Sequence, residues 1–583
     1  MRITRRPALA SFVPAVGLLL AGGLLAGCGN VPQAFTAQVP TSGPIQQGEQ
    51  VGGSSADQFI RVIARPPRPG MSAPEIVQGF LDASASFDGD HAVAREYLTD
   101  EASLRWDPSV GVVVYEGVPA LTESGPSVQF SATQAGTIEE GGRYQVVDPG
   151  TEALATFRLV ETDEGLRIDG LPNGLLLSQT DVDRAFRSYA LYYFNPDFEI
   201  LVPDSRMIPV IGPGLATTLV RRLLEGPSDW LQPAVRTGFP DGVGLNIDAV
   251  LVDGGVARVD LDAAVQVADD AARQALSQQL VWTLRQLPDV QSVDITAAGQ
   301  PFFVPDVPNP QPRDAWPDVD PSGLLPGSSA YVASSIGVRR ITDDGTEPVD
   351  GQAGSRNPLF TEIAISADSS RIAGLDAQQQ LSGGSLTPNA TLFPFRGAAL
   401  PVNIAFDGPA NLWAVDEDGE VLLYSPSGRA FPIEVEGLAD DDVLRAAVPS
   451  RDRTRAALLV QSGPRTNLLL ARIVRPSPTG RVGITLQDPI RVESKLVEVV
   501  DVAWSSADSL AVLGSESAGA VQVYEVDIGR GSLLAQGAPE SPVSLAAAPG
   551  LPTLVAGADG VVYDNSSGSW SGRLNATSPA YPG

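Results

Sequence analysis

Hydrophobic residues take on helical spacing where the first globular stretch begins. The segment Ser72-Ala-Pro-Glu75 has the pattern of a capping box with proline in the first turn, so it predicts a helix start. The next apolar positions keep helical intervals: Ile76, Val77, Phe80 and Leu81. A second helix is expected over residues 90–98, and strand-like runs follow at 111–115, 128–132, 144–147 and 153–160. Helices followed by a meander predict a small α+β domain, curved and cone-like, over residues 71–185.

The stretch over residues 186–301 combines two helix patterns with several strand patterns. Strands are expected at 189–194 and 199–202, with a turn at 203–206 and a return strand at 207–210. One helical stripe consists of Leu215, Ala216, Leu219, Val220, Leu223 and Leu224, and Gly226-Pro227 ends that helix. A second stripe consists of Leu276, Leu280, Leu284 and Leu287. Residues 256–261 alternate, with Arg258 and Asp260 on the polar face, and residues 290–295 form a last strand. A second α+β domain is predicted.

Residues 302–327 are rich in proline and are expected to be a linker or an inter-domain strap. A weak repeat follows it, consisting of Ile363-Ala-Ile-Ser, Ile404-Ala-Phe-Asp, Ala446-Ala-Val-Pro, Val502-Ala-Trp-Ser and Leu545-Ala-Ala-Ala. Each member precedes a second apolar run: 371–375, 411–415, 455–460, 509–513 and 552–556.

The spacing of this repeat is close to the ~40–50 residues of a propeller blade, and Asp-Gly hairpin turns separate strand-like runs at 344–345, 418–419 and 559–560. We expect a C-terminal all-β propeller over residues 328–583 with about six blades, five and seven being alternatives. A half-blade near residues 330–341 would complete the ring with the C-terminal strands. An array of two-sheet sandwiches is the other possibility.

The amino-terminal stretch has the features of a bacterial lipoprotein signal. Basic residues precede an apolar run at 15–25, and Leu25-Ala-Gly27 leads directly to Cys28, the only cysteine of the chain. We expect cleavage between Gly27 and Cys28, and lipidation of Cys28 by an S-diacylglycerol and an N-acyl group. Residues 1–27 are then the signal peptide and 28–70 a lipidated tether, holding the protein on the extracytoplasmic face of the cell membrane. An ordinary signal peptide or a buried thiol is the alternative.

Composition narrows the possible partners. A formal net charge of −30 argues against nucleic acid, whose binding depends on lysine and arginine, and against a chain lying flat on an anionic leaflet. A hydrophobic content of 43% is ordinary for folded domains, and the length requires several of them. Lys495 is the only lysine, so basic charge is almost all arginine, which is typical of a GC-rich genome such as that of an actinobacterium.

Residues for catalysis by familiar constellations are scarce. His91 is the only histidine, which leaves no histidine-based triad and no His/Cys metal site, and we expect it to be a surface or capping residue. The sequence therefore predicts no enzyme and no cofactor. Carboxylate pairs stay open, with Asp318 and Asp320, or the run 416–418, as candidates and solvated turns as the alternative. Four tryptophans belong either to blade cores or to a propeller mouth: Trp316, Trp413, Trp504 and Trp570.

The second domain resembles the sporulation and spore-germination module called GerMN. The matching pieces are Leu201-Val-Pro203 with Arg206 and Ile208-Pro209, Leu223-Leu-Glu-Gly-Pro227, Ala257-Arg-Val-Asp-Leu261, and residues 281–284. Arg206 and Asp260 are candidates for an ion pair or a ligand contact; a surface pair or turn contact is the alternative. Lipobox, tether, small α+β domain, GerMN-like module and propeller occur in this order in the LpqB family of actinobacterial lipoproteins, which the whole chain resembles.

That resemblance implies an accessory of the MtrA–MtrB two-component system. The expected partner is the extracellular domain of the sensor histidine kinase, and the expected role is to modulate signalling linked to envelope homeostasis and division. A cell-wall glycan is a further candidate ligand. The alternatives are a glycan-binding scaffold and a carboxylate-dependent glycan hydrolase in the propeller.

Substituting Cys28→Ala removes the thiol that takes up the diacylglyceryl group, so we expect the protein to leave the membrane fraction while still folding. Fractionation followed by a high-salt wash measures this, with the unsubstituted protein as control. A variant that stays on the membrane after the wash contradicts the lipid anchor.

Overall fold

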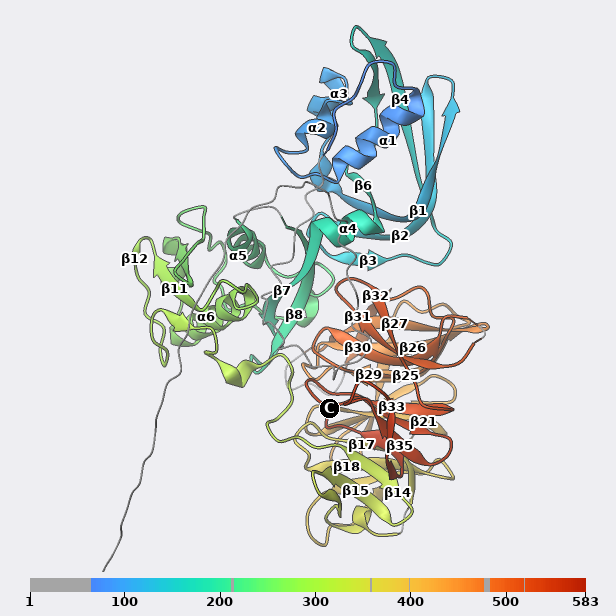
Figure 1. The fold of residues 1–583 in the computed structure, drawn as a ribbon. Coiled ribbons are helices and arrows are strands. Elements are labelled where there is room, and N and C mark those ends of the chain that lie inside the picture. The colour runs from blue at the N-terminus through green and yellow to red at the C-terminus, as the bar shows by residue number, and fades with distance from the viewer. Residues whose placement is uncertain (1–63, 211–213, 357–358, 398, 477–482, 518) are drawn as a thin grey trace, which may run out of the picture. The chain divides into compact units, whose positions relative to one another are not determined.

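The computed structural model describes residues 64–210, 214–356, 359–397, 399–476, 483–517 and 519–583. The expected signal peptide, Cys28 and nearly all of the expected tether lie outside these residues. Figure 1 shows three successive folded parts: an α+β part, a second α+β part and an all-β part. The predicted multi-domain fold class is thus confirmed. Short 3₁₀ turns occur at Pro108–Val110, Gln232–Ala234, Ala263–Val267, Pro317–Val319 and Gln352–Gly354.

The first α+β part packs short helices against one strongly bent sheet. Its helices are α1 (Ala73–Ser84), α2 (Ala92–Arg95), α3 (Asp100–Arg105) and α4 (Gln179–Ala185). Its strands are β1 (Gly111–Ser124), β2 (Ser127–Glu139), β3 (Tyr144–Val146), β4 (Glu152–Thr162), β5 (Gly165–Gly170) and β6 (Leu175–Ser178). The sheet order is β5-β4-β2-β1-β6, and irregularities in the β1–β2 register bend the long strands.

The predicted capping box starts α1, since Ser72 N–H donates to the Glu75 carboxylate at 2.7 Å. The predicted apolar face of α1 is buried in the core of this part. The helix expected over 90–98 is wrong in extent: α2 covers only Ala92–Arg95, and the Thr99 hydroxyl accepts from Ala102 N–H to start α3. Thr99 therefore caps a separate helix that begins just after the expected one.

The second α+β part contains a two-stranded ribbon, two helices and a small mixed sheet. The ribbon is β7 (Phe186–Phe194) with β8 (Leu201–Pro209), and the helices are α5 (Leu215–Glu225) and α6 (Asp270–Leu284). The sheet consists of β9 (Leu251–Asp253), β10 (Val256–Leu261), β11 (Ser292–Ala297), β12 (Gln300–Pro301) and β13 (Gln311–Pro312). Both predicted helical stripes face its core, and the apolar positions of β10 alternate inward as expected.

One expectation for this part is wrong. The sequence predicts a turn at residues 203–206, but β8 runs through them. The chain instead turns at 195–200, where the Asn195 side chain accepts from Glu199 and Ile200 N–H. A two-stranded ribbon leaves outward N–H groups unpaired, so Pro203 is tolerated. Residues 302–327, expected to be a linker or an inter-domain strap, pack onto the domain along much of their length, because Phe302 and Val304 are buried in its core and β13 pairs with β11.

The C-terminal part is a propeller of six four-stranded blades, counted over the described residues. The first blade consists of β14 (Tyr331–Ser334), β15 (Gly337–Thr342), β16 (Gly345–Pro348) and β37 (Thr577–Ala580). The second consists of β17 (Phe360–Ile365), β18 (Arg371–Asp376), β19 (Leu381–Ser385) and β20 (Phe393–Pro394). The third consists of β21 (Pro401–Asp407), β22 (Asn411–Asp416), β23 (Val421–Tyr424) and β24 (Ala430–Val435).

The remaining blades follow in sequence order. The fourth consists of β25 (Val443–Pro449), β26 (Arg455–Ser462), β27 (Arg465–Val474) and β28 (Thr485–Arg491), and β28 also pairs with β24 of the third blade. The fifth consists of β29 (Glu498–Trp504), β30 (Ser509–Ser515), β31 (Gln522–Asp527) and β32 (Ser532–Gly537). The sixth consists of β33 (Pro542–Ala546), β34 (Leu554–Gly557), β35 (Val561–Asp564) and β36 (Ser571–Asn575).

The repeat found in the sequence forms the innermost strands, and the second apolar runs form the strands beside them. The predicted ring closure is confirmed, because the C-terminal β37 pairs with β14. One repeat member is out of register: a bulge between Leu444 and Ala446 makes Ala447, not Ala446, the equivalent of Ile404. No helix among the described residues is long and apolar enough to cross a membrane.

Candidate functional site: the propeller channel

The single histidine is buried, not exposed as expected. His91 is 5% exposed, stands at the N-cap of α2 without a side-chain capping bond, and packs against Phe87 and Trp106. Burial lowers its pKa. It is therefore a core residue of the first domain.

The ion pair considered between Arg206 and Asp260 is wrong. Arg206 instead pairs with Asp204 at 2.7 Å, and Asp204 also accepts from Ser228 N–H, so both charges are satisfied inside the domain. Asp260 accepts from Thr296 Oγ1 and from Gly299 N–H, which is a contact to the turn after β11. Arg206 and its actual partner lie two residues apart on one strand of the ribbon, so their side chains lie on the same face of that strand.

The carboxylates that the sequence singled out lie in turns. Asp320 accepts from Ser322 N–H, and Asp416 accepts from the N–H groups of Asp418 and Glu420. The tryptophans mostly pack: Trp413 is fully buried, Trp316 and Trp570 pack against hydrophobic clusters, and Trp504 is buried while also lining the channel described next. Cys28 and Gly27 lie outside the described residues.

A cavity of about 850 Å³ runs between the innermost strands β17, β21, β25, β29, β33 and β37. Each of these strands carries one bulge near its start, at Thr361, Val402, Arg445, Val500, Val543 and Ser578. The residue after each bulge lines the channel: Glu362, Asn403, Ala446, Asp501, Ser544 and Pro579. The bulges therefore place one ring of side chains just inside one end of the channel.

Hydrogen bonds from this ring connect neighbouring blades. Glu362 Oε1 accepts from Ile404 N–H of the next blade at 3.1 Å, and Asn403 Oδ1 accepts from Ala447 N–H at 3.1 Å. In the same way Asp501 Oδ2 accepts from Leu545 N–H at 2.8 Å.

At the other three seams, that is, the contacts between neighbouring blades, the ring makes different interactions. Ser578 Oγ, on the bulge itself, accepts from Ile363 N–H at 3.0 Å. Ala446 has no polar side-chain atom, and Val502 N–H of the next blade donates instead to Asp501 Oδ1 at 2.9 Å. At the third, the equivalent donor is Ala580 N–H, and the described structure has no hydrogen bond from it to the Ser544 side chain. The two charged members of the ring are thus anchored to backbone, with both Asp501 oxygens and one Glu362 oxygen engaged.

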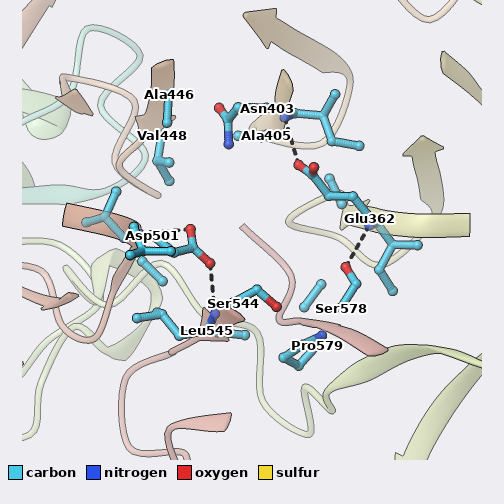
Figure 2. A pocket seen from close by; sticks show the side chains of 18 of the residues that line it. Glu362, Asn403, Ala405, Ala446, Val448, Asp501, Ser544, Leu545, Ser578 and Pro579 are labelled. Carbon is cyan, nitrogen blue, oxygen red and sulfur yellow. Dashed lines mark hydrogen bonds between the residues drawn. The ribbon is translucent and has the colours of Figure 1, made fainter. Parts of the chain in front are cut away.

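Figure 2 shows the carboxyl groups of Glu362 and Asp501 on opposite sides of the pocket. Burial, and then repulsion from Asp501, raise the pKa of Glu362 to about 8, although the Ile404 N–H opposes this. Burial raises the pKa of Asp501 to about 6 against the opposing effect of the Leu545 and Val502 N–H groups. Among the described residues neither carboxylate forms an ion pair. The channel thus holds two acids that have no ion-pair partner among the described residues.

Arg451 lies at the other end of the channel. Its guanidinium donates to three backbone carbonyls, of Pro582 at 3.1 Å, Trp504 at 3.2 Å and Ala547 at 3.3 Å. Burial lowers its pKa to about 10, which leaves it charged at neutral pH. The described residues contain no group of three or more histidine, cysteine, aspartate or glutamate side chains placed to hold a metal.

The sequence contains a signal for Glu362 and Asp501, although the predictions above do not name these two residues. Each directly precedes a repeat member, Ile363-Ala-Ile-Ser and Val502-Ala-Trp-Ser. A polar residue just before an apolar innermost strand marks the channel ring. Only the bulge turns that position toward the channel.

Family models match three consecutive parts of the chain. They are Lipoprotein LpqB, N-terminal domain, over residues 66–183, Sporulation and spore germination over 190–302, and Lipoprotein LpqB beta-propeller domain over 337–582. The chain is 32% identical over 624 residues to Lipoprotein LpqB of Thermobifida fusca (strain YX), covering 96% of this chain and 97% of that protein.

Lipoprotein LpqB of Mycobacterium tuberculosis (strain CDC 1551 / Oshkosh) is 27% identical over 593 residues, covering 94% of each chain. A similar solved structure is that of the tandem GerMN domains of the sporulation protein GerM from Bacillus subtilis. It has 17% identity and a TM-score of 0.19, covering 28% of this chain and 58% of that one.

Glu362→Gln should change how stability depends on pH. The folded protein holds a proton on Glu362 up to about pH 8, whereas the unfolded chain releases it near 4.5. Wild-type stability therefore falls as pH rises between these values, and glutamine, which keeps an acceptor for Ile404 N–H, avoids that loss. We expect the variant to gain on the order of 1–3 kcal/mol over wild type across this window.

Calorimetric unfolding at several pH values measures this gain. Asp440→Asn, which removes an exposed carboxylate outside the channel, is the matched control and should follow wild type. Parallel pH profiles for wild type and Glu362→Gln contradict a raised pKa at Glu362.

Proposed function

Because the chain belongs to the LpqB family of lipoproteins, we propose that it acts as a lipid-anchored, extracytoplasmic binding protein for a two-component sensor kinase. In this proposal it engages the extracellular domain of the kinase, as the resemblance to accessories of the MtrA–MtrB system implies. Its effect is to modulate signalling that bears on envelope homeostasis and division. The relatives over nearly the whole chain length support a lipoprotein role, and the kinase is our extension of it.

The observation that carries the binding role is the rim of the propeller channel. The bulge residues Val500 and Val543 are 40% and 49% exposed at the end of the channel next to the carboxylate ring. Exposed apolar side chains beside a cavity with fixed polar groups are typical of a binding site. This feature supports recognition of a partner at the propeller.

The lipid anchor would account for most of the probability that the protein meets the kinase. A lipid at Cys28 confines the protein to the membrane that holds the kinase, and the tether over residues 28–70 sets its reach, which raises the effective concentration of one for the other. To modulate signalling, the protein has to bind the two signalling states of the kinase with different affinity. Anchoring alone does not provide that difference, so the contact surface has to.

The soluble chain, residues 29–583, should bind the purified extracellular domain of the cognate kinase saturably. We expect a dissociation constant in the micromolar range or below, because membrane confinement tolerates modest affinity. Biolayer interferometry with a salt titration measures it, and the extracellular domain of an unrelated kinase from the same organism is the control. Equal signals for both domains, or none for either, contradict the proposal.

A second candidate is a carboxylate-dependent glycan hydrolase. One observation favours it: Glu362 and Asp501 face the same cavity with pKa values raised to about 8 and about 6, which would suit an acid and a base. Release of reducing ends from peptidoglycan or arabinogalactan fragments measures this activity. Glu362→Gln should lower it about 10²–10⁴-fold. No turnover by the wild-type protein removes this candidate.

A further inference from the structure

We propose that the ring-side end of the propeller channel binds a positively charged side chain, a lysine or arginine carried on an extended segment of a partner protein. This inference rests on the proposed function, because it names the part of the partner that the channel takes. The chemistry is that of an organic cation between two anchored carboxylates.

The first argument is that two acidic groups share the pocket without an ion-pair partner. Glu362 and Asp501 lie on different blades and face each other across the pocket, and neither has an ion-pair partner among the described residues (Figure 2). Glu362 Oε1 is engaged by Ile404 N–H, and the second oxygen of this carboxyl group has no hydrogen-bond partner in the described structure. A cation between the two groups favours the ionised form of Glu362, offsets its repulsion from Asp501 and satisfies the free oxygen.

The second argument is rigidity. Both carboxyl groups are held by N–H groups of innermost strands, Glu362 by one and Asp501 by two. Side chains fixed in this way pay little entropy when a ligand arrives, so the site is preorganised. A surface acidic cluster lacks such fixation, since its side chains are free to turn toward water.

The third argument is the shape and lining of the entrance. The bulge residues Val402, Val500 and Val543 surround the approach to the carboxylates with apolar surface, which suits the aliphatic stem of lysine or arginine. A cavity of about 850 Å³ falls within the range of sites that enclose a small ligand, so it has room for a charged side chain and its neighbours.

The other charged groups of the lining do not neutralise the pair. Arg445 is exposed at the rim and donates outward to the Glu417 carbonyl at 3.1 Å. Arg451 is held by three carbonyls at the opposite end. Inside the rim that carries Arg445, the lining thus has two acids near one end and Arg451 near the other, and the cation is expected at the acidic end.

Two capped peptides test the inference directly: acetyl-Val-Arg-Val-amide, and the same peptide with neutral citrulline in place of arginine. Calorimetric titration into residues 29–583 measures binding. We expect the arginine peptide to bind at least about tenfold more tightly than the citrulline peptide. A corresponding pair with lysine and acetyl-lysine shows which cation is preferred.

The double variant Glu362→Gln/Asp501→Asn should lose about tenfold or more in affinity for the arginine peptide. The matched control Asp440→Asn/Glu540→Gln removes the same two charges from exposed positions and should bind like wild type. Wild-type affinity should also rise from pH 6 to 8 with release of protons, because the cation binds the ionised form of Glu362. Asp501 is the charged group that faces Glu362 across the pocket, whereas Arg445 donates to the Glu417 carbonyl and Arg451 lies at the other end of the channel.

Equal binding of arginine and citrulline peptides to wild type overturns the inference without reference to any variant. Undiminished binding of the arginine peptide to the channel double variant overturns it as well. If the kinase domain binds wild type and the double variant equally, the channel inference fails while the proposed function stands. If the arginine peptide binds at the carboxylates and the kinase domain does not bind, the proposed function fails and the channel site stands.

Discussion

The pairing of β37 with β14 is the contact on which the rest of the propeller depends. It joins the last strand of the chain to the first strand of the propeller, through Tyr331 opposite Ala580 and Val332 opposite Pro579. Without it the first blade lacks its innermost strand and two sheet edges stay open, which invites pairing with other chains. Closing so long a loop has an entropic cost that grows only slowly with length, so the contacts of the seam can offset it.

Closure also creates the channel and sets its chemistry. One bulge in each innermost strand turns a ring of side chains inward, and several of these accept N–H groups of the neighbouring blade. Glu362 and Asp501 therefore stabilise the seams between blades while keeping carboxyl groups on a cavity. In such an enclosed site burial raises the pKa of both acids, and Asp501 raises that of Glu362 further, which makes the pair sensitive to any cation that enters.

The acidic end of the channel has the same sign of charge as the protein as a whole. A net charge of −30 disfavours anionic partners generally, and the acidic end of the channel concentrates this preference at one place. Arg451 at the opposite end keeps its charge at neutral pH, so the channel has acidic groups near one end and a positive charge near the other. A basic partner segment would meet attraction at long range and two fixed acceptors at short range.

The sequence by itself determined the elements whose causes are local. The capping box of α1, the apolar stripes of α5 and α6, the alternation of β10 and the repeat of the innermost strands are all visible as periodicity, because each reflects burial on one face. The tertiary structure decided the strand through Pro203, the partner of Arg206, the burial of His91 and the docking of residues 302–319. It also decided that Glu362 and Asp501 face one cavity, since blades far apart in the sequence bring them together and a bulge of one residue changes the face that a side chain occupies.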